Sequence, residues 1–315
     1  MPRRTPLVRM RSSLPVETFS RRWQTSWQKH RGQLHRTRQR PTGGNIHLLR
    51  TSTRRLLAIL DVARAVEFNR GIRTTRRRLR HLLAATGAAR DARVQLKLFG
   101  ALAPSASAKG ASQVRQHLRK RTHRLEHALG KLLKPYERKL PSGCPALPAA
   151  LRKGTAFDRA AQRELRRARN RIRRRFRAMQ AGVAGAHHRT RIALKRYRYL
   201  LEALPKISGA SPAEIAGLQV AQQRMGDLRD HDLCLHRLEK FSARHTAAQD
   251  WLQRRRPHLE ARERRLQKQQ PGVRGQKVAM IWQAVHSRGR RSGICWLGTA
   301  HSFAAPKSTS HRRKT

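Results

Sequence analysis

The stretch from residue 187 to residue 199 reads HHRTRIALKRYRY and is dense in side chains that carry or can acquire positive charge. On a helix, His188, Arg191, Lys195 and Tyr199 fall on one stripe, with Arg198 beside it. A guanidinium group is permanently charged and can donate two hydrogen bonds to one phosphate, whereas a lysine acts as a mobile point charge. The pattern therefore predicts a helix face that binds an anion.

The opposite face of this helix is apolar, which predicts how the stripe is held in place. Leu194, Tyr197 and Leu201 follow one another at helical spacing and can pack against neighbouring helices. One face of the helix is thus expected to join the core, and the other to face the anion.

The same phrase occurs earlier in the chain as HLLRTSTRRLLAIL. His47, Arg50 and Arg54 repeat the spacing of His188, Arg191 and Lys195, with the offset 188 − 47 = 141. A second pair of phrases, TGAARDARV (86–94) and MGDLRDHDL (225–233), places Arg-Asp three residues after Gly, with the offset 229 − 90 = 139. Two phrases repeated at nearly one offset predict two structurally similar halves.

These paired phrases resemble the CHAD domain, the conserved histidine α-helical domain, whose halves each carry H-x-x-R-x-x-x-[RK]-R-h-R and then G-x-x-R-D. The second half matches at His188, Arg191, Lys195, Arg196, Arg198, Gly226, Arg229 and Asp230. The first half matches at His47, Arg50, Arg54, Arg55, Gly87, Arg90 and Asp91. It departs from the pattern at Leu57, which stands where the third basic residue is expected, so its surface is expected to be weaker or differently shaped.

The resemblance covers about residues 16–268. It implies an all-α helical bundle of two pseudo-twofold-related halves around a basic central groove or pore that binds inorganic polyphosphate. Some members are fused to a triphosphate tunnel domain with an E-x-E-x-K signature, which this sequence lacks. The resemblance thus implies a stand-alone polyphosphate-binding module of the cytoplasm, with polyphosphate granules as an expected location.

The expected polyphosphate-binding residues are the basic members of both motifs: His47, Arg50, Arg54, Arg55, Arg90, His188, Arg191, Lys195, Arg196, Arg198 and Arg229. Asp91 and Asp230 are expected to orient the arginines, because a carboxylate among arginines has a lowered pKa and is a poor general base. The histidines either become protonated beside phosphate or stay neutral and hydrogen-bond to an aspartate. Neither motif carries a set of metal ligands, and no cofactor is expected.

Composition independently indicates a polyanionic partner. The 315 residues include Lys+Arg 73 against Asp+Glu 17, for a formal net charge of +56, so folding and anion binding are expected to be linked. Non-specific binding of nucleic acid through its phosphates is the main alternative, although aromatic residues are only 5% and form no evident stacking platform. Without a P-loop, an acidic metal cluster or an evident nucleophile, no enzyme activity is expected. No membrane span is expected either.

Helical periodicity prevails between two expected basic tails, 1–15 and 269–315. The halves are expected at about 16–140 and 158–268, joined by a linker at 141–157. Loop signals fall at 41–44, 103–112, 141–148 and 205–212. Ser211, Pro212 and Glu214 predict a capping box at a helix start. The segment 163–177 holds nine arginines in fifteen residues and is either a solvated face or a further wall of the anion site.

Overall fold

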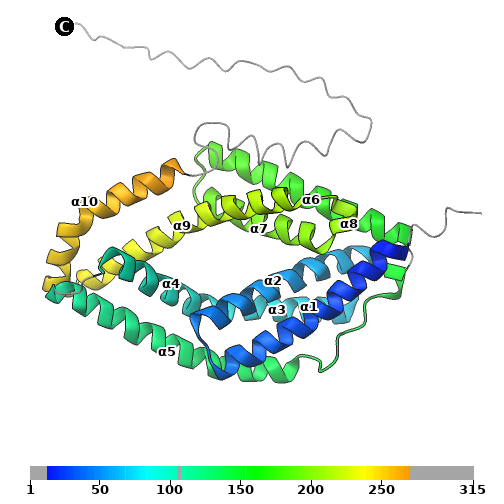
Figure 1. Ribbon diagram of the computed structural model, residues 1–315, viewed down its shortest axis with the longest axis horizontal. Coiled ribbons are helices and arrows are strands. Elements are labelled where there is room, and N and C mark those ends of the chain that lie inside the picture. The colour runs from blue at the N-terminus through cyan, green and yellow to red at the C-terminus, as the bar shows by residue number, and fades with distance from the viewer. Residues whose placement is uncertain (1–12, 68, 105–107, 153, 270–315) are drawn as a thin grey trace, which may run out of the picture.

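The protein is built from α-helices, as the sequence predicts. The computed structural model describes residues 13–67, 69–104, 108–152 and 154–269, and within these ranges there are helices and no strand (Figure 1). The all-α prediction is confirmed.

The two halves repeat the same order of helices. The first half contains α1 (Ser13–Gln39), α2 (Gly43–Val66), α3 (Arg70–Ala85), α4 (Gly87–Leu102) and α5 (Lys109–Lys139). The second half contains a short 3-10 helix, η2 (Ala149–Arg152), and then α6 (Gly154–Gln180), α7 (Ala186–Ala203), α8 (Pro205–Ser208), α9 (Pro212–Ser242) and α10 (Thr246–Lys268). Equivalent helices pack on each other, α2 on α7, α4 on α9 and α5 on α10, as expected for halves related by a pseudo-twofold axis.

One helix is broken in the first half and continuous in the second. With the offset of 139, α3 and α4 correspond to α9, and Thr86, between α3 and α4, corresponds to Met225 inside α9. The short α8 occupies part of 205–212, which the sequence predicts as a loop, because Pro205 at its first turn suits a helix start.

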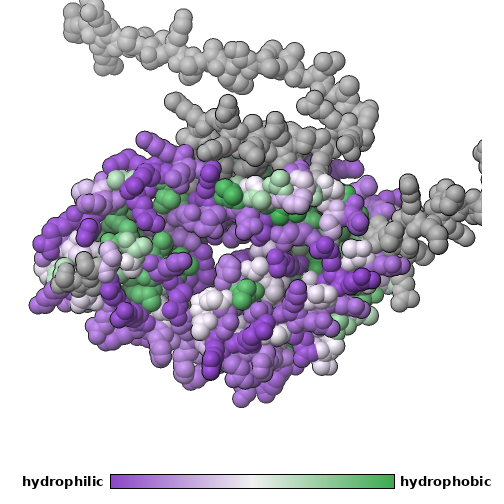
Figure 2. Space-filling view, in the orientation of Figure 1, coloured by the Kyte–Doolittle hydropathy of each residue, from purple (hydrophilic) through white to green (hydrophobic). Residues whose placement is uncertain are grey.

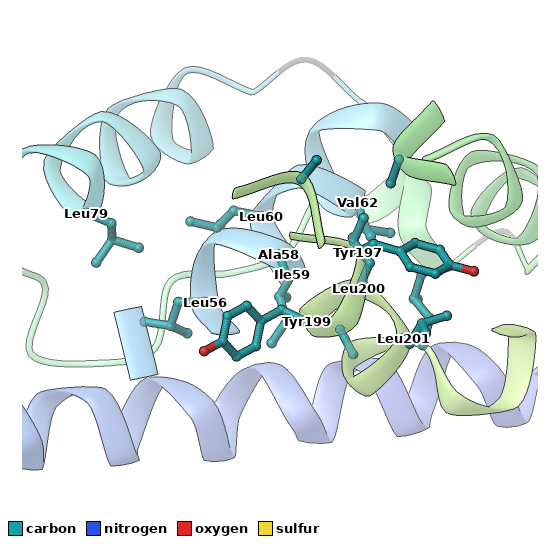
Figure 3. Close-up of a cluster of buried hydrophobic side chains, with 14 of the residues drawn as sticks. Leu56, Ala58, Ile59, Leu60, Val62, Leu79, Tyr197, Tyr199, Leu200 and Leu201 are labelled. Carbon is teal, nitrogen blue, oxygen red and sulfur yellow. The ribbon is translucent and has the colours of Figure 1, made fainter. Parts of the chain in front are cut away.

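Apolar side chains form two buried clusters. The larger lies among α1, α2, α3, α6 and α7 and includes Leu56, Leu60, Tyr197 and Leu201 (Figure 3). The smaller lies where α4, α5, α9 and α10 meet, around Trp251. Burying each large apolar side chain contributes about 1.5–3 kcal/mol, so the apolar faces predicted for α2 and α7 fix how these helices lie.

Several local predictions can be compared with the helix ends. Ser211 Oγ accepts from the Glu214 amide at 3.1 Å while Glu214 Oε2 accepts from the Ser211 amide at 2.8 Å, which confirms the capping box. Residues 13–15, predicted to belong to a tail, form the first turn of α1, and α6 begins inside the predicted linker. Residues 1–12 and 270–315, the rest of the predicted tails, lie outside the described residues. No helix in the described part of the chain is long and apolar enough to cross a membrane.

Candidate anion-binding site

The two copies of the basic motif meet where α2, α4, α7 and α9 converge. We call this group the central cluster: His47, Arg50, Arg54, Arg90, Asp91, His188, Arg191, Lys195, Arg229 and Asp230. Its members are close enough to shift one another's pKa across the two halves, as Lys195 lowers that of His47 and Arg90 lowers that of Arg191. The face of the molecule drawn in Figure 2 is hollowed near its middle, and mostly hydrophilic residues surround the hollow.

Lys195 is the most strongly perturbed member of the central cluster. Burial, together with the charges of Arg191, Arg54 and Arg90, lowers the pKa of Lys195 from 10.5 to about 6. Asp230 opposes this shift only in part. Positive charge is thus concentrated here beyond what the neighbouring carboxylates neutralise, and a bound anion would relieve the repulsion.

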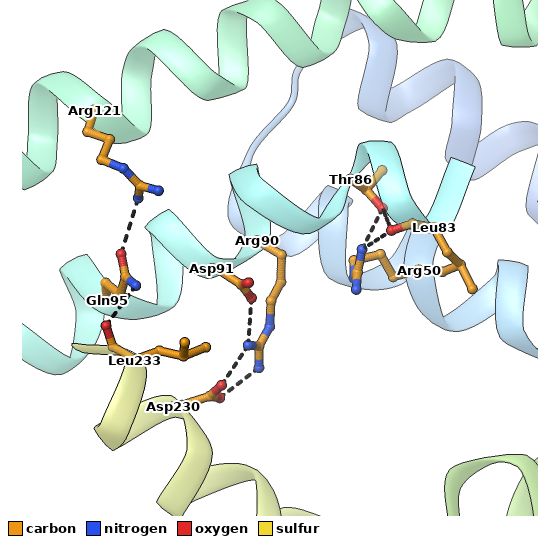
Figure 4. A network of polar contacts seen from close by, with 9 residues as sticks. All are labelled: Arg50, Leu83, Thr86, Arg90, Asp91, Gln95, Arg121, Asp230 and Leu233. Carbon is orange, nitrogen blue, oxygen red and sulfur yellow. Dashed lines mark hydrogen bonds and ion pairs between the residues drawn. The ribbon is translucent and has the colours of Figure 1, made fainter. Parts of the chain in front are cut away.

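Arg90 and Asp230 tie the two halves together across this cluster. The two guanidinium nitrogens Nη1 and Nη2 of Arg90 each donate to one oxygen of Asp230, both at 2.7 Å, and Nη1 also donates to Asp91 at 3.0 Å (Figure 4). Burial would lower the pKa of Arg90, but these hydrogen bonds raise it overall. The expected orienting role therefore has a geometric basis for Asp230.

The pseudo-symmetric counterpart of that ion pair is not formed. Arg229 is equivalent to Arg90, and Asp91 to Asp230, yet no ion pair joins Arg229 to Asp91 among the described residues. Arg229 instead lies close enough to His188 to lower its pKa. Of the two equivalent arginines, Arg229 is the one left available to an anion.

Arg50 has a structural partner that the sequence did not predict. Its Nη1 donates to the carbonyl of Leu83 and to Oγ1 of Thr86, both at 2.6 Å (Figure 4). These acceptors are at the C-terminal end of α3, where the break before α4 leaves carbonyl groups without a continuing helix. Arg50 thus caps α3 from the side of α2.

Arg191 occupies the equivalent place in the second half but meets a continuous helix. Its guanidinium lies over Gly226, where an added Cβ would be 3.5 Å from Nε. Its Nε is buried without a hydrogen-bond partner. The pKa of Arg191 is lowered, mainly by burial and further by the charges of Arg90, Arg54 and Arg229. The negative charge of Asp230 opposes this shift. Within the central cluster, Arg191 therefore has an N–H group that a ligand could use as a hydrogen-bond donor.

The environment of both motif histidines favours the neutral imidazole. Burial and the neighbouring cations lower the pKa of His47 and of His188. No hydrogen bond joins either ring to Asp91 or Asp230 in the described residues, and Nδ1 of His188 is buried without a partner. Protonation of the two histidines beside phosphate stays a prediction. A bound anion would raise the pKa of both rings and so oppose the lowering described here.

Three of the expected binding residues form ion pairs beside the cluster. Arg196 reaches Asp61 on α2 at 2.9 Å, and its equivalent Arg55 reaches Glu202 on α7 at 3.3 Å. The offsets 196 − 55 and 202 − 61 are both 141, so the two contacts are pseudo-symmetric ties between α2 and α7. Arg198 pairs with Glu202 at 2.7 Å and lies over the Tyr199 ring, at 4.4 Å from its centroid. Their predicted contact with polyphosphate is untested.

Two residues near the cluster, Tyr199 and Arg121, are not among the expected binding residues. Tyr199, placed on the stripe by its spacing, is buried and interacts with Arg54 of the other half. Arg121 on α5 donates to the Gln95 side chain at 3.1 Å, and Gln95 donates to the Leu233 carbonyl on α9. Burial and Arg237 lower the pKa of Arg121, while Asp91 opposes the shift. No repeated phrase marks Arg121, so its position follows from packing alone.

Comparison with known proteins places the chain in a family. The family model described as CHAD domain matches residues 24–214. The crystal structure of the CHAD domain from the plant Ricinus communis is similar at a TM-score of 0.54 and 21% sequence identity, over 87% of this chain and 92% of that one. No curated protein sequence matches significantly. The chain belongs to the CHAD domain family, as its motifs predict.

Proposed function

We propose that the central cluster binds inorganic polyphosphate. The observation that carries the proposal is the convergence of Arg54, Arg191 and Lys195 from both halves, with their charges incompletely neutralised. Each has a pKa lowered by burial and by neighbouring cations. A string of closely spaced phosphates would supply the missing anions from one ligand.

Polyphosphate fits these side chains better than nucleic acid does. The cluster offers guanidinium groups, an amine and two imidazoles, and the nearby ring of Tyr199 is buried with Arg198 over it. Proteins that bind single strands add exposed aromatic rings on which bases stack. Non-specific binding to nucleic-acid phosphates is the alternative that the experiment below separates.

The proposed role is binding rather than catalysis, in the cytoplasm and on polyphosphate granules. Asp230, the carboxylate that could otherwise serve as a general base, accepts two hydrogen bonds from Arg90. Both oxygens of this carboxylate are thus occupied by the guanidinium group and are not free to take a proton from a substrate. Incubation with polyphosphate and Mg²⁺ should leave chain length unchanged, and released phosphate would contradict this part of the proposal.

The test is a competition experiment at near-physiological salt. Labelled long-chain polyphosphate is bound to the full chain and displaced by unlabelled polyphosphate, duplex DNA or structured RNA at equal phosphate concentration. The variant Arg54→Gln/Arg191→Gln/Lys195→Gln removes three formal charges from the cluster, and Arg163→Gln/Arg166→Gln/Arg177→Gln removes three from exposed positions of α6.

The proposal expects polyphosphate to be the best competitor and the cluster variant alone to lose that advantage. Loss of even one charged hydrogen bond to phosphate costs about 1.5–3 kcal/mol, roughly a tenfold or greater loss of affinity. Equal competition by nucleic acid, with both variants weakened alike, would show generic attraction to a basic protein instead.

A further inference from the structure

A basic cavity lies between α2, α3, α6 and α7, apart from the central cluster. It has a volume of about 470 Å³, within the range of small-ligand pockets. Its charged lining consists of Arg64, Arg76, Arg80, Glu164, Arg167, Arg171 and Arg196. We call it the lateral pocket, because it is formed by different residues from those of the central cluster.

Two buried carboxylates hold the inner arginines of the lateral pocket. Asp61 accepts from Arg76 at 2.6 Å and pairs with Arg196 at 2.9 Å. Glu164 pairs with Arg167 at 3.0 Å and also with Arg196 at 3.2 Å. The side chains of Asp61 and Glu164 are only 7% and 4% exposed, so these positions are fixed from inside the fold. Arg196 is thereby shared between two acids and bridges α2 and α6.

The remaining three arginines have no such partner. Arg64, Arg80 and Arg171 are exposed and form no ion pair within the described ranges. The pKa of Arg80 is lowered by burial and by the charges of Arg76, Arg196 and Arg64, and the charge of Asp61 only partly offsets this shift. The pKa of Arg171 is likewise lowered by burial and by Arg196, while the charges of Asp61 and Glu164 oppose the shift. Six arginines with two carboxylates leave the pocket with a surplus of 6 − 2 = 4 positive charges.

The lateral pocket is separate from the central cluster. Arg196 follows Lys195 directly, and successive residues of a helix point about 100° apart, so α7 presents them to different sites. On α2, Arg64 lies ten residues beyond Arg54, roughly 15 Å along the axis. The cations that most affect Arg80 and Arg171 are members of the pocket or its neighbour Arg174, and none belongs to the central cluster.

The charge of the pocket does not follow from the duplicated fold. At the offsets of the repeat, Arg64 corresponds to Pro205 (64 + 141), Arg76 to Ile215 (76 + 139) and Arg80 to Gln219 (80 + 139). The equivalent positions of the second half therefore carry no charge. Arg64, Arg76 and Arg80 thus have no charged counterparts in the second half, and the charge that they bring to Arg167, Arg171 and Arg196 is not repeated by the pseudo-symmetry of the fold.

We propose that the lateral pocket is a second anion site, which takes a compact ligand with several clustered phosphate groups. Guanidinium groups from four helices can hold such a ligand with bidentate hydrogen bonds, and none of the described residues that line the cavity has an aromatic side chain to recognise a base. Inorganic tripolyphosphate is the simplest probe with this chemistry. A free oligophosphate and the end of a longer polyphosphate chain both present such clustered phosphate groups.

The test is calorimetric titration of the full chain with tripolyphosphate in low-phosphate buffer at physiological salt. The central-cluster variant, Arg54→Gln/Arg191→Gln/Lys195→Gln, serves as the background, so that failure of the proposed polyphosphate site does not affect the result. In this background, Arg64→Gln/Arg80→Gln/Arg171→Gln is compared with Arg163→Gln/Arg166→Gln/Arg177→Gln, which removes the same charge. The three pocket arginines hold no carboxylate, so the melting temperature without ligand should not fall.

We expect one tripolyphosphate site in the background variant, at least tenfold weaker in the pocket variant and unchanged in the α6 control. No measurable site in the background, or equal weakening by pocket and control substitutions, would overturn the proposal. Repeating the titration with long-chain polyphosphate distinguishes the ligands. A site that binds both probes accepts chain ends, and a site that binds tripolyphosphate alone selects free oligophosphates.

Discussion

Arg50 and Arg191 have the same place in the two copies of one motif, yet they do different things. Arg50 caps the end of α3 through Leu83 and Thr86, whereas Arg191 lies over Gly226 without a hydrogen-bond partner for its Nε. The difference follows from the helix they face, which is broken at Thr86 in the first half and continuous in the second. Both copies of the motif thus carry the arginine, but in the first half its hydrogen bonds are made within the fold.

The aspartates of the two halves should differ most in their effect on stability. Asp230→Asn removes the negative charge and replaces one of the two oxygens that accept from Arg90 at 2.7 Å with an NH2 donor, whereas Asp91, which is more exposed, has one contact with Arg90 at 3.0 Å. We expect Asp230→Asn to lower the free energy of unfolding by about 2–3 kcal/mol and Asp91→Asn by about 0.5 kcal/mol. Urea-induced unfolding measures both, and equal losses would mean that the asymmetry does not exist in solution.

The two equivalent arginines should separate stability from binding. Arg50→Gln should lower the free energy of unfolding by about 1.5–3 kcal/mol, because two hydrogen bonds from a charged donor are lost. Arg191→Gln should leave stability unchanged or higher, because it removes a cation from a repulsive cluster, but weaken polyphosphate binding about tenfold. Unfolding and calorimetric titration of both variants test this. The reverse assignment of effects would show that Arg191 is the structural member of the pair.

Lys195 should link binding to pH in a way that its counterpart Arg54 cannot. Its pKa in the folded protein is about 6 against 10.5 in the unfolded chain, so the unfolded chain holds the extra proton between these values and stability rises with pH there. A bound polyanion raises the lowered pKa, so binding takes up a proton and strengthens as pH falls from 8 to 6, by at most about tenfold per unit for one proton.

Titrations in buffers of different ionisation enthalpy measure that proton uptake at pH 7.5. Lys195→Arg gives this position a permanent charge without a titratable proton and is the matched variant, in which uptake should fall to the part contributed by His47 and His188. The same uptake in wild type and variant would show that the histidines alone account for it.

Substitutions of the two motif glycines, Gly87 and Gly226, should differ least in their effect on the free energy of unfolding. Gly226 lies inside α9, and an added Cβ would meet Arg191 only at ordinary contact distances, whereas an added Cβ at Gly87 would meet nothing within 4 Å at the start of α4. Gly226→Ala should therefore raise the free energy of unfolding by about 0.5–1 kcal/mol, and Gly87→Ala by less. Thermal unfolding compares them. Destabilisation by Gly226→Ala would show that Arg191 needs the space above this glycine.

Much of the helical framework could be predicted from local signals. Apolar residues at helical spacing marked the buried faces of α2 and α7, with Leu49, Leu56, Leu194 and Leu201 all buried. The capping box at Ser211 marked the start of α9, because both of its partners lie within three residues. Turn-rich phrases gave less certain boundaries, as at 205–212, because a single helical turn and a loop share the same residues.

Two similar halves, each with a basic helix face, can be predicted from the amino-acid sequence, because repeats and periodicity are local features of the chain. Which of those basic residues lack a partner within the protein depends on tertiary packing. Arg50 donates to acceptors that are 33 and 36 residues away in the sequence, and Arg90 donates to Asp230, which is 140 residues away. Arg196 forms an ion pair with Asp61 of the other half. The state of an arginine depends on the groups that packing brings beside it, and neither spacing nor composition contains that information.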